Sequence, residues 1–264
     1  MKHFVDELLN REYDLRKEVV SLETLFLRKS GGYSIYDKFS ARFIDWELRN
    51  NYIDFDDFFA ETGLEEITEK GHLGCDISLD EYIYYCEYML NVLAFPVVWD
   101  HRYANPILDN IMRVLPKINY APHQSGNVYH IVQKDVLVSE AADIVQSNYD
   151  LGEGIYAFNY RETKGNLVRK ADILCRLYKY IESITPQAKQ YGYATLLDDI
   201  KDLSNKLDIR HAPTIKQGVV IGDMDVAEYE EWLDEIFKLS LTLIILVDYT
   251  TKRKDIKELK SKLG

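Results

Sequence analysis

Arg210 and His211 are the residues of this sequence whose types and spacing best suit acid–base chemistry. They follow a segment predicted to be helical, because apolar residues recur along it at helical spacing: Leu196, Leu197, Ile200, Leu203 and Leu207. Their position, three and four residues beyond Leu207, places the pair on the packed side of this helix or at its edge. Pro213 then disfavours further helix. Burying unpaired polar groups is costly, so the pair is either satisfied structurally or part of a site.

The chemistry open to this pair is proton transfer beside a bound phosphate. Arginine and lysine side chains give proteins their affinity for a nucleic-acid backbone. A histidine whose pKa is near the ordinary value of about 6.5 can move a proton from a ribose 2′-hydroxyl. This combination needs no metal ion, so we expect neither a metal nor another cofactor.

A basic segment precedes the Arg-His pair and is a candidate for binding phosphate. Residues 161–179 contain six basic side chains against two acidic ones, a local charge of +4 in a chain of net charge -12. Its candidate phosphate-binding residues are Lys164, Arg169, Lys170 and Arg176. The alternative is a solvated helix face opposite an apolar stripe, which is what such charge runs usually form.

Composition and charge limit the other function classes. A net charge of -12 argues against non-specific binding of the whole molecule to nucleic acid or to a bilayer. Three widely spaced cysteines predict buried free thiols in a reducing compartment rather than a disulfide framework. The longest apolar run, residues 239–247, has about half the length that a membrane span requires. The N-terminus enters an acidic amphipathic helix, with no signal peptide. We therefore expect a cytoplasmic protein with no membrane partner.

Other motifs that carry chemistry are weak or absent in the sequence. It contains no phosphate loop, no dinucleotide fingerprint and no nucleophile elbow. His72 and Cys75 have the spacing of a metal-binding pair, but no second pair completes four ligands. Acidic pairs such as Glu230-Glu231 are typical of solvated helix faces. The Arg-His pair and the basic segment thus remain the candidate site.

The periodicity of apolar residues predicts a mostly helical chain. In the first half, helices are expected at 3–29, 35–50, 54–60, 78–93 and 104–116, with a loop at 63–77. A capping box, Ser78 with Glu81, marks the start of the fourth of these helices. The loop 119–127 is the expected boundary between an N-terminal lobe (1–120) and a C-terminal bundle (121–264), unless the two form one continuous domain.

The second half has one ambiguous segment among further helices. Residues 128–138 are β-branched and partly alternating, so a short strand or extended segment is expected ahead of a helix at 136–146. Helices follow at 167–185, at 193–210 and at 226–249, with Pro186 separating the first two and a basic tail at 252–262. The predicted fold class is all-α, a multi-helix bundle.

The C-terminal half resembles the HEPN superfamily of small helical bundles. The resemblance covers about residues 150–250 and rests on Asn205-x4-Arg210-His211, the loop that follows and a long apolar last helix. Many members are metal-independent ribonucleases of toxin–antitoxin, abortive-infection and CRISPR-linked defence systems. Their signature places a histidine four to six residues after the arginine, whereas Arg210 and His211 are adjacent. The resemblance implies His211 as general acid/base, Arg210 as phosphate ligand and Asn205 as an orienting residue.

Two function classes follow from these features. The first is a HEPN-like bacterial defence or toxin-type protein that cleaves RNA and has RNA or a cognate antitoxin or defence protein as its partner. The second is a non-catalytic helical scaffold or protein-interaction module in which Arg210 and His211 tie a helix end to the following loop. Cations near a helix C-terminus are favoured by its free carbonyls and its dipole.

The apolar run at 239–247 predicts self-association. It is apolar on every side, and soluble monomers rarely expose so large an apolar patch. We therefore expect a two-fold homodimer built on the C-terminal bundle. HEPN-like active sites are commonly composite, so a dimer of this kind would bring together two copies of Arg210. The alternative is a monomer in which residues 1–120 cover the last helix.

Overall fold

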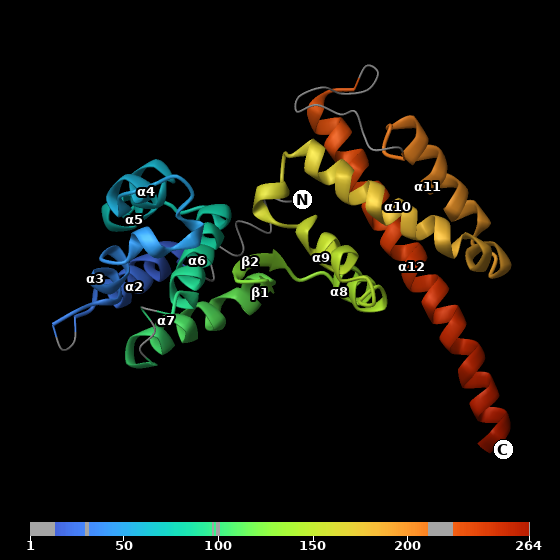
Figure 1. The fold of residues 1–264 in the computed structure, drawn as a ribbon, viewed down its shortest axis with the longest axis horizontal. Helices are drawn as coiled ribbons and strands as arrows, with labels where there is room; N and C mark the ends of the chain where they lie inside the picture. The colour runs from blue at the N-terminus through green and yellow to red at the C-terminus, as the bar shows by residue number, and fades with distance from the viewer. Residues whose placement is uncertain (1–13, 30–31, 97, 99–100, 211–223, 264) are drawn as a thin grey trace. The chain divides into compact units, whose positions relative to one another are not determined.

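The computed structural model describes residues 14–29, 32–96, 98, 101–210 and 224–263, which form two compact units, 1–133 and 134–264. Their described residues contain eleven α-helices and one two-stranded sheet (Figure 1). The all-α prediction is therefore confirmed. The boundary between the units lies between Gln133 and Lys134, and not after residue 120 as predicted. It lies there because a β-hairpin packs on a helix of the first unit and therefore belongs to that unit.

The described part of the N-terminal unit consists of six α-helices, three short 3-10 helices and the hairpin. The α-helices are α2 (Leu15–Leu27), α3 (Ile35–Ser40), α4 (Phe55–Glu61), α5 (Leu64–Leu73), α6 (Leu79–Ala94) and α7 (His101–Val114). The 3-10 helices are η1 (Phe43–Asp45), η2 (Glu47–Arg49) and η3 (Leu115–Ile118), and the strands are β1 (Tyr120–Ser125) and β2 (Val128–Gln133). Helix α6 begins at the predicted capping box, where Ser78 and Glu81 bond each other's backbone N–H.

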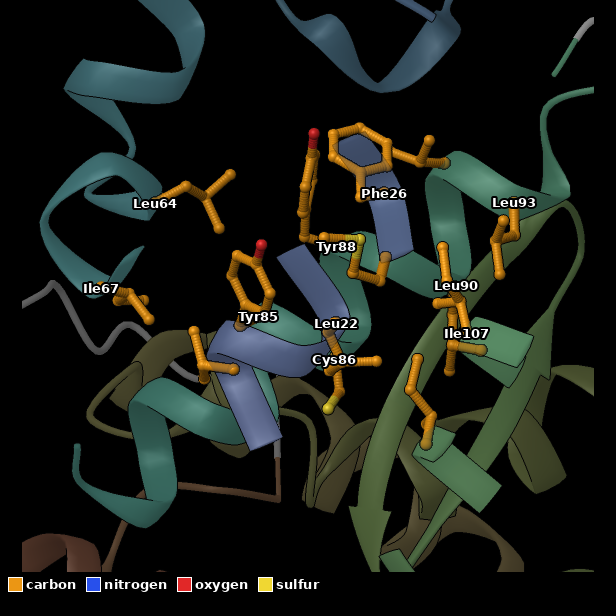
Figure 2. Packing of buried hydrophobic residues seen from close by; sticks show 14 of the residues in the cluster. Leu22, Phe26, Leu64, Ile67, Tyr85, Cys86, Tyr88, Leu90, Leu93 and Ile107 are labelled. Carbon is orange, nitrogen blue, oxygen red and sulfur yellow. The ribbon is translucent and has the colours of Figure 1, made fainter. Parts of the chain in front are cut away.

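Aromatic rings fill the core around α6. Phe39 is fully buried and meets five other rings edge to face: Phe43, Trp46, Phe55, Tyr88 and Phe95. Figure 2 shows the rings of Phe26 and Tyr88 close together, and their centroids are 6.3 Å apart at an interplanar angle of 80°. Edge-to-face pairs of this kind stabilise a core beyond the area that they bury.

The hairpin is attached to α6 through side chains of that helix. Asn91 accepts a hydrogen bond from the N–H of Tyr129 and donates one to its carbonyl, both 2.8 Å long. Glu87 accepts the N–H of Ile131 at 2.9 Å. These bonds satisfy the backbone groups of β2 that point away from β1, so the strand needs no third strand on that side. Most of the segment 119–127, predicted to be the lobe boundary, forms β1 and pairs with β2.

The predicted loop at 63–77 was wrong, because it contains helix α5. Gly63 and Gly74 cap the two ends of this helix in the left-handed conformation, with φ of 79° at each. Gly71 lies inside it, where a Cβ atom would be 3.0 Å from Val20 of α2. Two of the glycines that indicated a loop thus cap a helix, and the third allows this helix to pack closely against α2.

The described part of the C-terminal unit contains five α-helices and one 3-10 helix: α8 (Val136–Ile144), α9 (Tyr149–Ala157), η4 (Arg161–Thr163), α10 (Leu167–Gln190), α11 (Ala194–Lys206) and α12 (Val226–Leu263). Helix α9 is not predicted by the sequence patterns, and α10 continues through Pro186 where a break was expected. A proline inside a helix costs about 3 kcal/mol. Packing offsets this cost, because Ile181 before it and Ala188 after it are buried in one cluster with Leu243.

The apolar run at 239–247 lies in the middle of α12 and is covered within its own unit. Leu241 and Ile244 are buried in one cluster with residues of α8 and α10, and Leu243 and Val247 in another with residues of α10 and α11. Helices α8, α10 and α11 therefore cover the apolar faces of α12 that were predicted to contact the N-terminal half or a second subunit.

Candidate functional site

The candidate site begins where α11 ends. This helix stops at Lys206, four residues before the predicted end, and Asp208 adopts a left-handed conformation with φ of 52°. The N–H of Ile209 then bonds the carbonyl of Ser204 at 2.9 Å. This is the bond that closes a Schellman helix end, and buried Ile209 supplies the apolar contact that accompanies it. Arg210 consequently lies in a turn after the helix and not on its apolar stripe.

Helix α12 fixes this helix end from one side. The hydroxyl of Tyr229 donates a buried hydrogen bond of 3.0 Å to the carbonyl of Leu207. Burial raises the pKa of Tyr229 to about 12, because an ionised phenol would lose its solvation there. The bond satisfies one of the last carbonyls of α11, which have no partner within the helix.

Arg210 fixes the same end from the side of α10. Its guanidinium donates to Glu182 at 3.2 Å and to Asn205 at 3.5 Å, and it lies over the ring of Tyr178, 5.6 Å from the centroid. Its backbone carbonyl accepts a weak bond from the Cys175 thiol. The structure thus brings together two of the three residues assigned to catalysis, Arg210 and Asn205. The third, His211, lies outside the described residues.

The positive charge of Arg210 is compensated by the neighbouring carboxylate of Glu182. The Arg210 side chain is 40% exposed and Glu182 is 44% exposed, so solvent still reaches both. A carboxylate beside a guanidinium cancels most of the field that would attract a phosphate. A ligand phosphate would therefore have to displace Glu182 or share the guanidinium with it.

Lys170 of the basic segment is buried and forms ion pairs with two carboxylates. Its ammonium is 2.7 Å from Glu230 and 2.5 Å from Asp234, both on α12, and 6% of its side chain is exposed. Burial alone would raise the pKa of Glu230, but the bonds from Lys170 and from the N–H of Gly165 lower it overall. Lys170 also lies over the ring of Phe158. These contacts join the start of α10 to α12 and leave little of the lysine for a phosphate.

Carboxylates also accompany two further cations of this segment. Arg169 pairs with Glu162 at 2.5 Å, and Arg176 pairs with Asp172 at 2.8 Å along α10. Lys164 is exposed and acts electrostatically on Glu230. The positive charge that the sequence concentrates in residues 161–179 is thus largely balanced by acidic side chains around it.

Sequence reasoning missed the acidic and aromatic partners of these cations. Glu182 and Tyr178 lie on α10, about thirty residues before Arg210. Glu230, interpreted from the sequence as part of a solvated pair, is mostly buried and holds Lys170. Nothing in the local sequence indicates these pairings, because the partners approach only when α10 packs against α11 and α12.

The described part of the chain has neither a metal-binding cluster nor a membrane-spanning helix. It contains no cluster of three His, Cys, Asp or Glu side chains placed to hold a metal, and His72 pairs with Glu23. Cys86 and Cys175 are buried free thiols as expected, whereas Cys75 is exposed. None of the described helices has the length and apolar character needed to cross a bilayer.

A comparison with protein-family models, curated proteins and solved structures finds no match to this chain. The assignment of a function therefore depends on the geometry of Arg210, Asn205 and the basic segment, together with the resemblance in their sequence pattern.

Proposed function

We propose that this protein is a non-catalytic helical scaffold or protein-interaction module, in which Arg210 is structural. The observation that carries the proposal is the pairing of Arg210 with Glu182 on α10. With Tyr229 holding Leu207 from α12, the end of α11 is fastened to both neighbouring helices. In this role Arg210 stabilises the end of a helix. The role does not require a guanidinium that is available to bind a substrate.

The basic segment supports the same role. Catalysis or binding at a phosphate needs positive charge that is not already compensated. Arg169, Lys170 and Arg176 each have a carboxylate within ion-pair distance. Lys170 in particular contributes to the packing of α10 on α12, because its charge is removed from water together with Glu230.

A HEPN-like ribonuclease or defence toxin is the second candidate function. One observation favours it: Asn205 and Glu182 hold the partly exposed Arg210 guanidinium in place, directly before His211 in the sequence. In this case His211 is the general acid/base, Arg210 the phosphate ligand and Asn205 the orienting residue. A homodimer and an RNA or antitoxin partner belong to this candidate.

Substitution of Arg210 and His211 separates the two functions. The scaffold role predicts that Arg210→Ala lowers the free energy of unfolding by about 1 kcal/mol, the size of a partly exposed ion pair with a cation–π contact. It also predicts that wild type and His211→Ala leave a structured RNA intact to the same extent. Lys206→Ala, at the end of the same helix, is the matched control and should change neither property.

RNA cleavage by wild type that is lost in His211→Ala would overturn the scaffold role. Light scattering with and without salt then tests the associated dimer, since a mass near 31 kDa throughout corresponds to a monomer of this 30.9 kDa chain. An Arg210→Ala protein of unchanged stability would likewise contradict a structural role for this arginine.

A further inference from the structure

The C-terminal end of α12 extends beyond the helices that cover the rest of it. Among the described residues, its last hydrogen bonds to its own bundle are those of Thr250 to Tyr193, 2.8 Å, and of Thr251 to Tyr191, 3.3 Å. The side chains described after Thr250 are all exposed. Figure 1 shows this end of the helix (red) running on past α8, α10 and α11. The extension from 252 to 263 is about 18 Å long at the rise of an α-helix.

An apolar stripe runs along this extension. Tyr249, Ile256 and Leu263 are seven residues apart, and Leu259 falls three residues after Ile256. Their side chains are 57%, 49%, 78% and 55% exposed, respectively. At about 100° per residue, the four span an arc of about 80° on the helix. A stripe this narrow, at heptad a and d positions, is typical of a coiled-coil seam and narrower than the face of a helix that lies on a core.

Positive charge surrounds the stripe. Residues 252–262 contain six basic and two acidic side chains, so this extension carries +4 in a chain of -12. Arg253 and Lys260 occupy the e positions beside the seam, and the g positions hold Asp255 and Lys262. Side chains at e and g set the choice of partner in a coiled coil, because they face the corresponding positions of the other helix.

The apolar stripe and its basic flanks favour one kind of binding partner over three others. A second copy of the extension would place two segments of +4 side by side, which is unfavourable. A lipid surface is disfavoured because a helix that lies on a bilayer buries a wider apolar face than this arc of about 80°. A nucleic-acid backbone would satisfy the cations but leave the apolar side chains in water. An acidic amphipathic helix satisfies both.

We propose that the extension of α12, residues 252–263, together with Tyr249 forms the docking surface for an acidic amphipathic helix of a partner protein. Leu, Ile or Val side chains of that helix would cover Ile256, Leu259 and Leu263, while its glutamates or aspartates would face Arg253 and Lys260. This inference rests on the proposed interaction role and gives it a defined surface and a class of partner.

The test uses the full-length protein and a synthetic acidic helical peptide of three heptads, with Leu at a and d and Glu at e and g. Binding is measured by fluorescence anisotropy at about 50 mM salt, where charge complementarity is weakly screened. We expect Leu259→Asp and Lys260→Glu each to weaken binding by at least about tenfold. Lys257→Glu makes the same charge change away from the seam and should weaken binding by less than about threefold. Circular dichroism checks that each variant keeps its helices.

Other outcomes would overturn the proposal. They are no binding of the peptide, equal binding by wild type and Leu259→Asp, or equal binding when Gln replaces every Glu of the peptide. Sedimentation velocity showing self-association that needs Leu259 would identify a second copy as the occupant. Tighter binding to vesicles of three parts phosphatidylcholine and one part phosphatidylserine, or to polyuridylate, would identify a lipid or an RNA. The RNA-cleavage test of the proposed function depends on His211, so failure of either proposal is recognisable separately.

Discussion

The two units stabilise their helices by different means. In the N-terminal unit, aromatic rings around α6 supply the core, and the buried hydroxyls of Tyr85 and Tyr88 have no hydrogen-bond partner among the described residues. In the C-terminal unit, an ion cluster and hydrogen bonds join helix ends, as Lys170 does with α12 and Tyr229 with α11. Both units have apolar cores, but aromatic packing is concentrated in the first, whereas in the second a buried lysine with two carboxylates joins α10 to α12.

This difference bears on where a binding function is located. Polar and charged groups that sit beside a core are available for a ligand only if the protein's own side chains do not already occupy them. In the C-terminal unit the internal partners occupy Arg210 and Lys170. The extension of α12 is the contrasting case, because its apolar stripe and those of its charged side chains that the structure describes are exposed to solvent.

The largest loss of stability is expected from a substitution in the aromatic core of the N-terminal unit. Phe39→Ala removes a fully buried ring with five edge-to-face neighbours, and we expect it to lower the stability of this unit by about 4 kcal/mol. Hydrogen exchange followed by mass spectrometry should show lost protection in α6. A loss of less than about 1 kcal/mol, typical of surface sites, would contradict an aromatic origin of this unit's stability.

A smaller loss is expected when the ion cluster of the C-terminal unit is broken. Lys170→Ala leaves Glu230 and Asp234 without their cation, and we expect a loss of about 3 kcal/mol in the stability of this unit. Arg176→Ala is the matched control, because it breaks an exposed pair worth about 0.5 kcal/mol. Equal effects of the two substitutions would remove the distinction between this cluster and an ordinary surface pair.

The smallest expected change in stability is the one that alkaline pH causes. Burial raises the pKa of Tyr229 to about 12 and those of Tyr85 and Tyr88 well above the ordinary value of 10.0. Stability from these groups is complete below pH 10, and it falls as the pH rises further, because the unfolded chain then releases protons that the folded chain retains. The N-terminal unit, with several such tyrosines, should lose exchange protection first as the pH increases from 10.

Substitution of Tyr229 tests the alkaline response of the C-terminal unit. Tyr229→Phe removes the proton that responds to pH and the bond to Leu207, so the C-terminal unit should be less stable by about 1 kcal/mol at neutral pH. Its stability should also fall less steeply between pH 10 and 12 than that of wild type. An unchanged slope would show that other groups dominate the alkaline response of this unit.

The sequence alone determined the fold class and many of the helix boundaries. Apolar periodicity predicts α6 and α11, and the local hydrogen bonds of the capping box at Ser78 begin α6 where the pattern places it. These signals are local, because the groups that form them are within four residues of each other. The same locality explains why glycines at 63, 71 and 74 and Pro186 were misleading: their effect depends on what packs against them.

Whether the cations of the candidate site are paired depends on contacts between distant parts of the chain. The sequence identified Arg210, Asn205 and the basic segment as candidate site residues. Whether such a cation is available to a ligand depends on the side chains that reach it, and Glu182, Glu230 and Asp234 come from positions 28 to 64 residues away. Ion pairing is a matter of distance in space, and neither composition nor spacing along the chain specifies that distance.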